Sequence, residues 1–445
     1  MGIEIAPRAM SIEARTILKL KIRILPFVWL LYIVAFLDRI NIGFAALTMN
    51  KELAITSQQF GFVAGIFFIG YSICEIPSNL LLHKIGARIW LARILITWGI
   101  LATLTGFVRS AHQLYVARFL LGLAEGGYFP GILLYLTYWF RQREQAQAVA
   151  LFITGIPVAG ILGAPLSGMI LDHVHSFGLG SWRWLLILEG IPAVVCGVLT
   201  YFLLPSGPAE AKFLTQNEKD WIAAQIKAEE EDKRRAHSVS AVRALIHGRV
   251  WHLAAVAFAV GTSVYIANFW LPQIIKAVAI GYSNTLVGIL VMAPNVVGLV
   301  LMIIISRSSD RRLERRWHTA VPAIVGGIAC LSFGAAHSLF LSMVLLSLFT
   351  VGIYGASGPF WTMPSQFLSG FSAASGIAVV SAIANLGGFA GPYAVGVIGQ
   401  RTGSLNGGMT LAGIALLVLA SLVLLLPKMP HTLAAEFARP SANDS

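Results

Sequence analysis

The chain has 445 residues, of which 57% are hydrophobic and 12% are charged, and its formal net charge is +12. Soluble globular domains are usually about 45–50% apolar and about 25% charged. The composition therefore excludes a water-soluble enzyme, a disordered chain and a nucleic-acid-binding module, and it favours an all-α protein of the lipid bilayer.

Crossing the hydrocarbon core of a bilayer takes about 20 mostly apolar residues. Twelve such stretches are found, at about 24–47, 60–82, 89–109, 114–139, 148–171, 184–204, 250–275, 284–306, 319–337, 339–363, 374–399 and 408–427. We therefore predict twelve transmembrane helices in two pseudo-symmetric six-helix bundles, 24–204 and 250–427. A cytoplasmic N-terminal segment (1–23), a linker (205–249) and a tail (428–445) complete the chain.

The linker is the only long polar segment. Its pattern predicts an amphipathic helix around Phe213–Ala228. The charge run Glu229–Arg235 that follows is interpreted as a solvated cytoplasmic segment.

The distribution of Lys and Arg predicts the orientation in the membrane. With the N-terminus placed inside, 25 of the 32 Lys and Arg fall in inside segments and five in outside loops. This asymmetry follows the positive-inside rule, and it accounts for the positive charge without a nucleic-acid partner. Both termini are expected to be cytoplasmic.

The two halves contain similar motifs of glycine and proline. Gly160-x-x-Gly163-Ala-Pro165 in the fifth stretch resembles Gly388-x-x-Gly391-Pro392 in the eleventh. Parallel repeats of this kind are typical of secondary transporters with a substrate site near the bilayer midplane.

Motifs for other chemistries are missing from the sequence. Cys74, Cys196 and Cys330 are far apart in apolar stretches and are expected to be inert packing residues. The chain has no G-x-x-x-x-G-K-[ST] and no H-E-x-x-H sequence. We expect no cofactor, no bound metal and no enzymatic activity. Because the N-terminus is polar and basic, we do not expect it to be a cleavable signal.

Few charges lie inside the spans, where each one costs about 2.5–3.5 kcal/mol on insertion scales. Asp38 and Arg39 are neighbours in the first stretch, and Asn41 shares the helix face of Asp38. A role in substrate or ion handling is favoured over an ion pair that only locks helices.

Arg118 and Glu125 are seven residues apart in the fourth stretch, so they share a helix face. A carboxyl held between burial and a nearby Arg can titrate near neutrality, as a proton relay requires. A structural ion pair is the alternative. Glu75 and Glu189 lie near span ends and are interpreted as structural residues that pair with loop cations or snorkel.

The second half has no acid or base deep in a span. It offers aromatic and amide side chains that suit an organic substrate: Asn268, Trp270, Gln273, Tyr354, Trp361, Ser365, Gln366 and Asn385. Of these, Asn385 is favoured because it lies in mid-span, where an apolar residue would cost less.

Several long segments resemble a known family. They are 37–50 (LDRINIGFAALTMN), 60–71 (FGFVAGIFFIGY), 86–90 (GARIW), 118–126 (RFLLGLAEG) and 385–392 (NLGGFAGP). Over nearly its whole length the chain resembles the major facilitator superfamily, and within it the anion:cation symporter family. The most similar branch is that of bacterial permeases for tartrate, phthalate and 4-hydroxyphenylacetate. His83 and Asn79 depart from the residues usual in the loop after the second span.

The resemblance implies proton-driven uptake of a small organic carboxylate across the bacterial inner membrane by a monomer. It assigns Asp38 and Glu125 to proton coupling, Arg118 to pairing with or tuning Glu125, and Arg39 to the substrate carboxylate. Tyr71 and Asn385 become site-lining residues, with Asn268 and Trp361 as further candidates. The rival functions are an organic-anion exchanger or facilitator on the same fold and, less favoured, a drug-type exporter.

Overall fold

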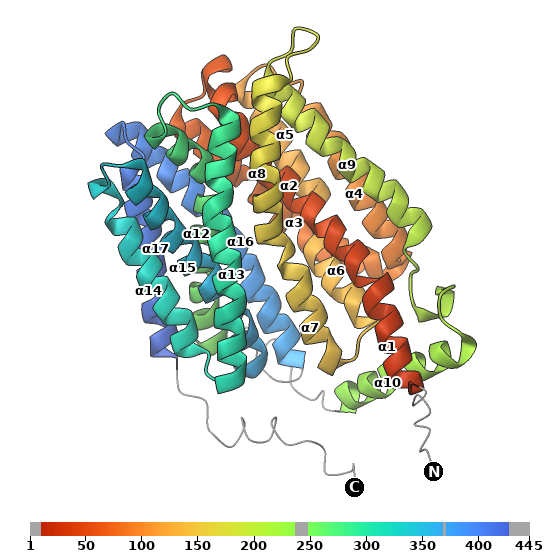
Figure 1. Cartoon of the computed structure of the whole chain (residues 1–445). Helices are drawn as coiled ribbons and strands as arrows, with labels where there is room; N and C mark the ends of the chain where they lie inside the picture. Colours follow the sequence, from red (N-terminus) through yellow and green to blue (C-terminus); the bar gives the residue numbers. More distant parts are fainter. Residues whose placement is uncertain (1–9, 236–247, 368–370, 427–445) are drawn as a thin grey trace, which may run out of the picture. The chain divides into compact units, whose positions relative to one another are not determined.

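The computed structural model describes residues 10–235, 248–367 and 371–426, and within these ranges it contains helices and no strands. The long helices are drawn in Figure 1. In chain order the helices are α1 (Ile12–Arg23), α2 (Leu25–Glu52), α3 (Ser57–Ile85), α4 (Ala87–Thr105), α5 (Ala111–Glu125), α6 (Tyr128–Thr137), α7 (Gln142–Ile153), α8 (Gly155–His173), α9 (Ser181–Leu203), α10 (Gln216–Arg235), α12 (Gly248–Val278), α13 (Asn284–Arg312), α14 (Arg316–Leu331), α15 (Leu339–Phe367), α16 (Phe371–Thr402) and α17 (Asn406–Leu425). Two short 3-10 helices, η1 (Pro208–Glu210) and η2 (Phe333–Ala335), complete the series.

The helices coincide with the twelve predicted spans. Eleven helical stretches of the described residues are long and apolar enough to cross a membrane. The remaining expected span, 319–337, corresponds to α14 and η2; α14 alone has 16 residues. The chain is a multi-pass, all-α membrane protein, as predicted.

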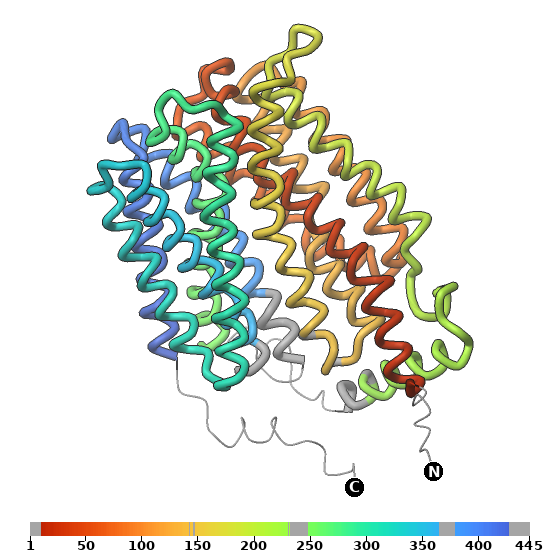
Figure 2. The backbone as a smooth tube through the Cα atoms, in the orientation of Figure 1, coloured from red at the N-terminus to blue at the C-terminus, as the bar shows by residue number. Residues whose placement is uncertain are grey.

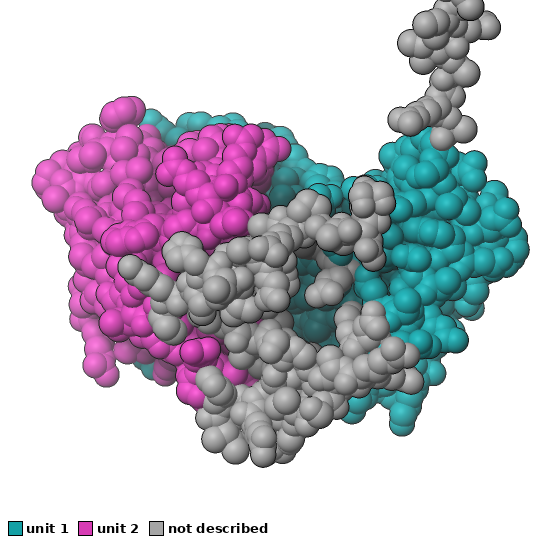
Figure 3. Space-filling view, turned by 90° about the horizontal axis from the view of Figure 1, so that it is seen from below, with its two compact units in different colours: residues 1–239, 268–292 teal, residues 240–267, 293–445 magenta. Residues whose placement is uncertain are grey.

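Contacts divide the chain into two compact units, coloured separately in Figure 3. Unit 1 comprises residues 1–239 and 268–292, and unit 2 comprises 240–267 and 293–445. The proposed boundaries of the two six-helix bundles stay a prediction.

Two contacts explain why residues 268–292 belong to unit 1. Asp172, near the end of α8, accepts hydrogen bonds from the backbone N–H groups of Asn284 (3.1 Å) and Thr285 (2.6 Å) at the start of α13. Such a carboxylate satisfies N–H groups that have no partner inside the helix. The ring of Trp270 on α12 also packs edge-on against Phe60 of α3, with centroids 5.1 Å apart.

Within each unit, helices approach closely through glycine. A Cβ on Gly122 of α5 would lie 2.0 Å from the carbonyl oxygen of Phe67 on α3. In unit 2, a Cβ on Gly261 of α12 would lie 2.1 Å from the carbonyl oxygen of Ala384 on α16. Small residues are common at helix interfaces in membranes, where backbone contact replaces the hydrophobic effect.

The fourth predicted span is interrupted. The helix stops at Glu125 because Gly126 leaves the helical region (φ −52°, ψ 126°) and Gly127 takes a left-handed conformation (φ 86°). A Cβ on Gly127 would lie 2.4 Å from Ser78 of α3, so space and conformation both require glycine there. The break makes Glu125 the last residue of α5.

The linker helix is present as α10, which begins and ends later than expected and includes the charge run Glu229–Arg235. Its first turn packs beside α1, which continues along the chain into α2 (Figures 1 and 2). Glu218 of α10 is fully buried and forms ion pairs with Arg15 (3.0 Å) and Lys19 (2.8 Å) of α1. The start of the linker is therefore bound to the N-terminal helix of unit 1.

Candidate functional site

The central feature of unit 1 is a buried ion pair between Arg39 of α2 and Glu125 of α5. Their side chains are 7% and 1% exposed, and Arg39 Nη2 donates a hydrogen bond to Glu125 Oε1. A buried charge is costly in a membrane unless it is paired or serves a function. The structure thus gives Glu125 a partner on another helix, whereas the spacing had indicated Arg118 on its own helix.

Aromatic rings surround the Arg39 guanidinium. Its Cζ atom lies 4.9 Å from the ring centre of Phe36, 5.3 Å from that of Phe67 and 5.5 Å from that of Tyr71. Cation–π attraction of this kind holds a guanidinium in place without neutralising it. Tyr71, predicted to line the site, therefore lies beside the predicted substrate anchor.

Asp38 is held by neutral donors. It accepts hydrogen bonds from Trp98 Nε1 of α4 (2.5 Å) and from Asn41 Nδ2 (3.1 Å), which confirms that Asn41 shares its face. Arg118 and Arg39 act on it electrostatically. Trp98 was missed in the sequence, because nothing in an apolar stretch distinguishes a tryptophan that donates to a buried acid from one that packs.

Arg118 of α5 is buried against α3. Its Nε donates to the carbonyl oxygen of Val63 (3.4 Å), and its Cζ lies 5.0 Å from the ring centre of Phe67. Phe67 therefore contacts both guanidinium groups. The four charges Asp38, Arg39, Arg118 and Glu125, which we call the charge cluster, sum to zero when all are ionised.

Asn268 lies against α2 within one turn of Arg39. A Cβ on Gly43 would lie 3.0 Å from the carbonyl oxygen of Asn268, so the two backbones touch. The Asn268 Nδ2 atom is buried and has no hydrogen-bond partner among the described residues. The lining role of Asn268 stays a prediction.

Trp361 of α15 and Asn385 of α16 belong to unit 2, and their place in the site stays a prediction. Near Asn385, α16 packs closely on α12, since a Cβ on Gly387 would lie 2.4 Å from the carbonyl oxygen of Phe258. Gly387 thus serves helix packing, as does Gly391, whose added Cβ would lie 2.9 Å from the carbonyl oxygen of Thr262.

The surroundings of Glu189 differ from those predicted from the sequence. It was interpreted as a structural residue that pairs with a loop cation or snorkels, but it is buried (4% exposed) and accepts a hydrogen bond from Ser167 of α8 (2.8 Å). Arg183, on the same helix, forms an ion pair with Glu52 (3.0 Å) and donates hydrogen bonds to two backbone carbonyls.

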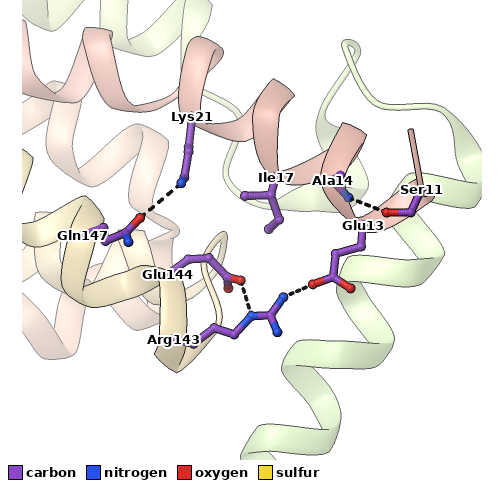
Figure 4. A pocket seen from close by; sticks show the side chains of 8 residues that line it. All are labelled: Ser11, Glu13, Ala14, Ile17, Lys21, Arg143, Glu144 and Gln147. Atoms are coloured by element: carbon purple, nitrogen blue, oxygen red, sulfur yellow. Dashed lines mark hydrogen bonds and ion pairs between the residues drawn. The ribbon is translucent and has the colours of Figure 1, made fainter. Parts of the chain in front are cut away.

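A separate polar pocket lies between α1 and α7 (Figure 4). Glu13 forms an ion pair with Arg143, which also pairs with Glu144 (2.6 Å), whereas Lys21 donates a hydrogen bond to the neutral side chain of Gln147 (3.2 Å). The pocket contains none of the charge cluster, and its two acidic and two basic lining residues sum to zero charge.

The fold and the buried charges define a multi-pass membrane transport protein. Residues 28–392 match the Major Facilitator Superfamily, and the chain belongs to that superfamily.

Individual relatives agree with this membership. The chain is 45% identical over 420 residues to a protein of Agrobacterium vitis named "Putative tartrate transporter", covering 94% of this chain and 92% of the relative. It is 35% identical over 408 residues to an Acinetobacter baumannii protein named "Quinolone resistance transporter", covering 92% and 94%. Its fold is similar to that of the xylose transporter XylE from E. coli, with a TM-score of 0.72, 15% identity, and 92% and 98% of the two chains covered.

Proposed function

We propose that the protein is a proton-coupled symporter that takes up a small organic carboxylate across the bacterial inner membrane by alternating access. Both termini would lie in the cytoplasm, as the distribution of Lys and Arg predicts. The similarity to a relative named for tartrate transport supports an organic acid as cargo.

One observation carries the proposal: Glu125 forms an ion pair with the guanidinium of Arg39, the group that would bind the substrate. An ionised Glu125 and a substrate carboxylate compete for Arg39. A proton on Glu125 ends that competition, because the neutral acid gives up its ion pair. Proton and anion binding then favour each other, which is the reciprocal coupling that symport requires.

The test is Glu125→Gln in proteoliposomes. The neutral amide imitates the protonated state, so substrate binding should persist and lose its pH dependence. Proton-driven accumulation should vanish while counterflow exchange survives. Glu52→Gln, which removes the acid that pairs with Arg183, is the matched control and should keep proton-driven accumulation. Normal uphill accumulation by Glu125→Gln would remove Glu125 from the mechanism.

An exchanger or facilitator on the same fold is the first alternative. Uptake driven by an imposed pH gradient with no counter-anion loaded separates it from symport. An exporter is the second, favoured by the relative named for quinolone resistance. The two buried arginines favour cargo with an anionic group in either direction. Thermal-shift screening against hydroxy, sugar and aromatic acids, with a quinolone added, would identify the class.

A further inference from the structure

Arg93 of α4 is a cation without a partner in the described part of the protein. It lies six residues after Ala87, the first residue of α4, and inside the third predicted span. Its Nε atom is buried, and its side chain forms no hydrogen bond or ion pair with any described residue. Glu75, the one acid in α3 and α4, is not bound to it. A charge in a transmembrane helix is costly unless it is compensated, so Arg93 needs either water or a ligand from outside the chain.

Arg93 faces away from the charge cluster, towards the outer surface of unit 1. Ile89, Ile100 and Leu104 of α4 are 45%, 46% and 55% exposed. With about 100° between successive residues, Arg93 lies within about 40° of all three around the helix axis. Trp98, which contacts the charge cluster, is about 140° away from Arg93 on the same helix. Because an exposed apolar face of a membrane protein contacts lipid, the partly exposed Arg93 borders lipid.

Trp90 fixes the direction of the Arg93 side chain. The Cζ atom of Arg93 lies 3.9 Å from the ring centre of Trp90, three residues earlier, so the guanidinium is turned towards the start of α4. Trp90 is itself held by a hydrogen bond from its Nε1 to Ser78 Oγ of α3 (3.0 Å). Contact with an aromatic ring orients a guanidinium without neutralising it, so its N–H groups stay available to an anion.

The turn that joins α3 to α4 carries further positive charge. Lys84, near the end of α3, is exposed. Arg88 lies 3.5 Å from Glu210, and both side chains are partly exposed (38% and 48%). With Arg93, three cations stand against one acid at this end of the two helices. The distribution of Lys and Arg places this end on the cytoplasmic side, and only the choice of leaflet below depends on that orientation.

We propose that Arg93 binds the phosphate of an anionic phospholipid of the inner leaflet, with Trp90 as the residue that positions it. A guanidinium can donate two parallel hydrogen bonds to phosphate oxygens. The acyl chains would lie along the exposed apolar face of α4. Lys84 and Arg88 attract a lipid with net negative charge and repel the choline of a zwitterionic one, so an anionic lipid is preferred. This site is independent of the proposed substrate and of proton coupling.

Native mass spectrometry of the purified protein in detergent measures lipid binding directly, with dioleoyl phosphatidylglycerol compared against dioleoyl phosphatidylcholine. The wild type should bind phosphatidylglycerol about 10-fold more tightly, and Arg93→Leu should lose this preference through the loss of charge-assisted hydrogen bonds. Arg109→Leu, at an exposed arginine after the other end of α4, is the matched control and should keep it. Equal preference in the wild type and Arg93→Leu, or no preference in the wild type, would overturn the proposal.

Thermal unfolding in nanodiscs separates a lipid site from a structural role of Arg93. Leucine suits a lipid-facing position, so Arg93→Leu should fold, and its Tm should match or exceed that of the wild type in phosphatidylcholine. In phosphatidylglycerol the wild type gains a bound lipid that the variant lacks, so the Tm of the variant should be the lower one. The same difference in Tm in both lipids would refute the proposal.

Two further arms identify the ligand and the part played by Trp90. Inorganic phosphate at millimolar concentration should not displace phosphatidylglycerol; displacement would show a site for free phosphate and overturn the assignment to lipid. Trp90→Leu removes the ring beside the guanidinium and should weaken the preference for phosphatidylglycerol, whereas Trp90→Phe keeps a ring and should largely preserve it. An unchanged preference in Trp90→Leu would overturn the positioning role.

Discussion

At the scale of single residues, the two acids of the charge cluster have different kinds of partner. Arg39 is paired with Glu125, whereas Asp38 is held by Trp98 and Asn41. The two acids therefore differ in what they lose on protonation. Protonating Glu125 breaks an ion pair and releases a cation, while protonating Asp38 disturbs a set of neutral donors.

If Arg39 binds the substrate carboxylate through two hydrogen bonds, binding depends on the planar, two-pronged shape of its guanidinium group. Arg39→Lys keeps the charge but replaces the fork by a single ammonium group. Losing one charge-assisted hydrogen bond, about 1.5–3 kcal/mol, should lower kcat/KM for uptake about 10- to 100-fold. The measurement is concentration-dependent uptake in proteoliposomes, with the exposed Arg109→Lys as the control. Near wild-type rate and affinity in Arg39→Lys would contradict the assigned role.

At the scale of elements, glycine contacts set how closely helices can approach. Gly122 lets α5 touch the backbone of α3, and this contact positions both Glu125 and Arg118. The interface therefore fixes the geometry of the charge cluster as well as the packing.

We expect Gly122→Ala to force α3 and α5 apart, because the added Cβ would lie 2.0 Å from the carbonyl oxygen of Phe67. Overpacking of this kind costs about 1–3 kcal/mol. The Tm of the purified protein should fall, and substrate affinity should fall with it. Gly207→Ala, at a site with open space around the new Cβ, should change neither. An unchanged Tm in Gly122→Ala would mean that the interface can relax at no cost.

The contact between α1 and α10 is electrostatic and outside the predicted spans. Burial alone would raise the pKa of Glu218, but hydrogen bonds from Lys19 and Thr215 lower it from 4.5 to about 2. Because the folded-state pKa is the lower one, the stabilisation is complete above about pH 4.5 and is lost as the pH falls towards 2.

Glu218→Gln should therefore destabilise the protein at pH 7 by about 2 kcal/mol, and the difference from wild type should shrink below pH 4.5. Glu231→Gln on the same helix is the control. Its partner Lys227 is exposed and 4.0 Å away, so the loss should be at most about 0.5 kcal/mol. Thermal unfolding of both variants across this pH range is the measurement. Equal effects of the two substitutions would show that the buried contact contributes nothing specific.

At the scale of the whole molecule, the proposed function requires one orientation in the membrane. Single cysteines at Lys51 and Lys227, introduced after Cys74, Cys196 and Cys330 are replaced, should react with a membrane-impermeant thiol reagent from opposite sides. Lys51 should be labelled in intact cells and Lys227 only after the membrane is permeabilised. Labelling of both from the same side would refute the topology.

The places of the apolar membrane-spanning stretches followed from the sequence, whereas the break at Gly126 and Gly127 and the bounds of the linker helix did not. Crossing a bilayer requires long apolar segments, and the backbone must satisfy its own hydrogen bonds there, so each segment becomes a helix. The scarcity of charges inside those segments also singled out Asp38, Arg39, Arg118 and Glu125, because each needs a reason to be buried.

Only the tertiary structure decided how those charges are paired. Spacing along one helix placed Arg118 and Glu125 on a common face, yet Glu125 binds Arg39 from another helix. The hydrogen bond from Trp98 to Asp38 likewise joins different helices. Helical periodicity states which residues share a face, but which faces meet depends on close backbone contacts such as that at Gly122, and these form between segments far apart in the chain.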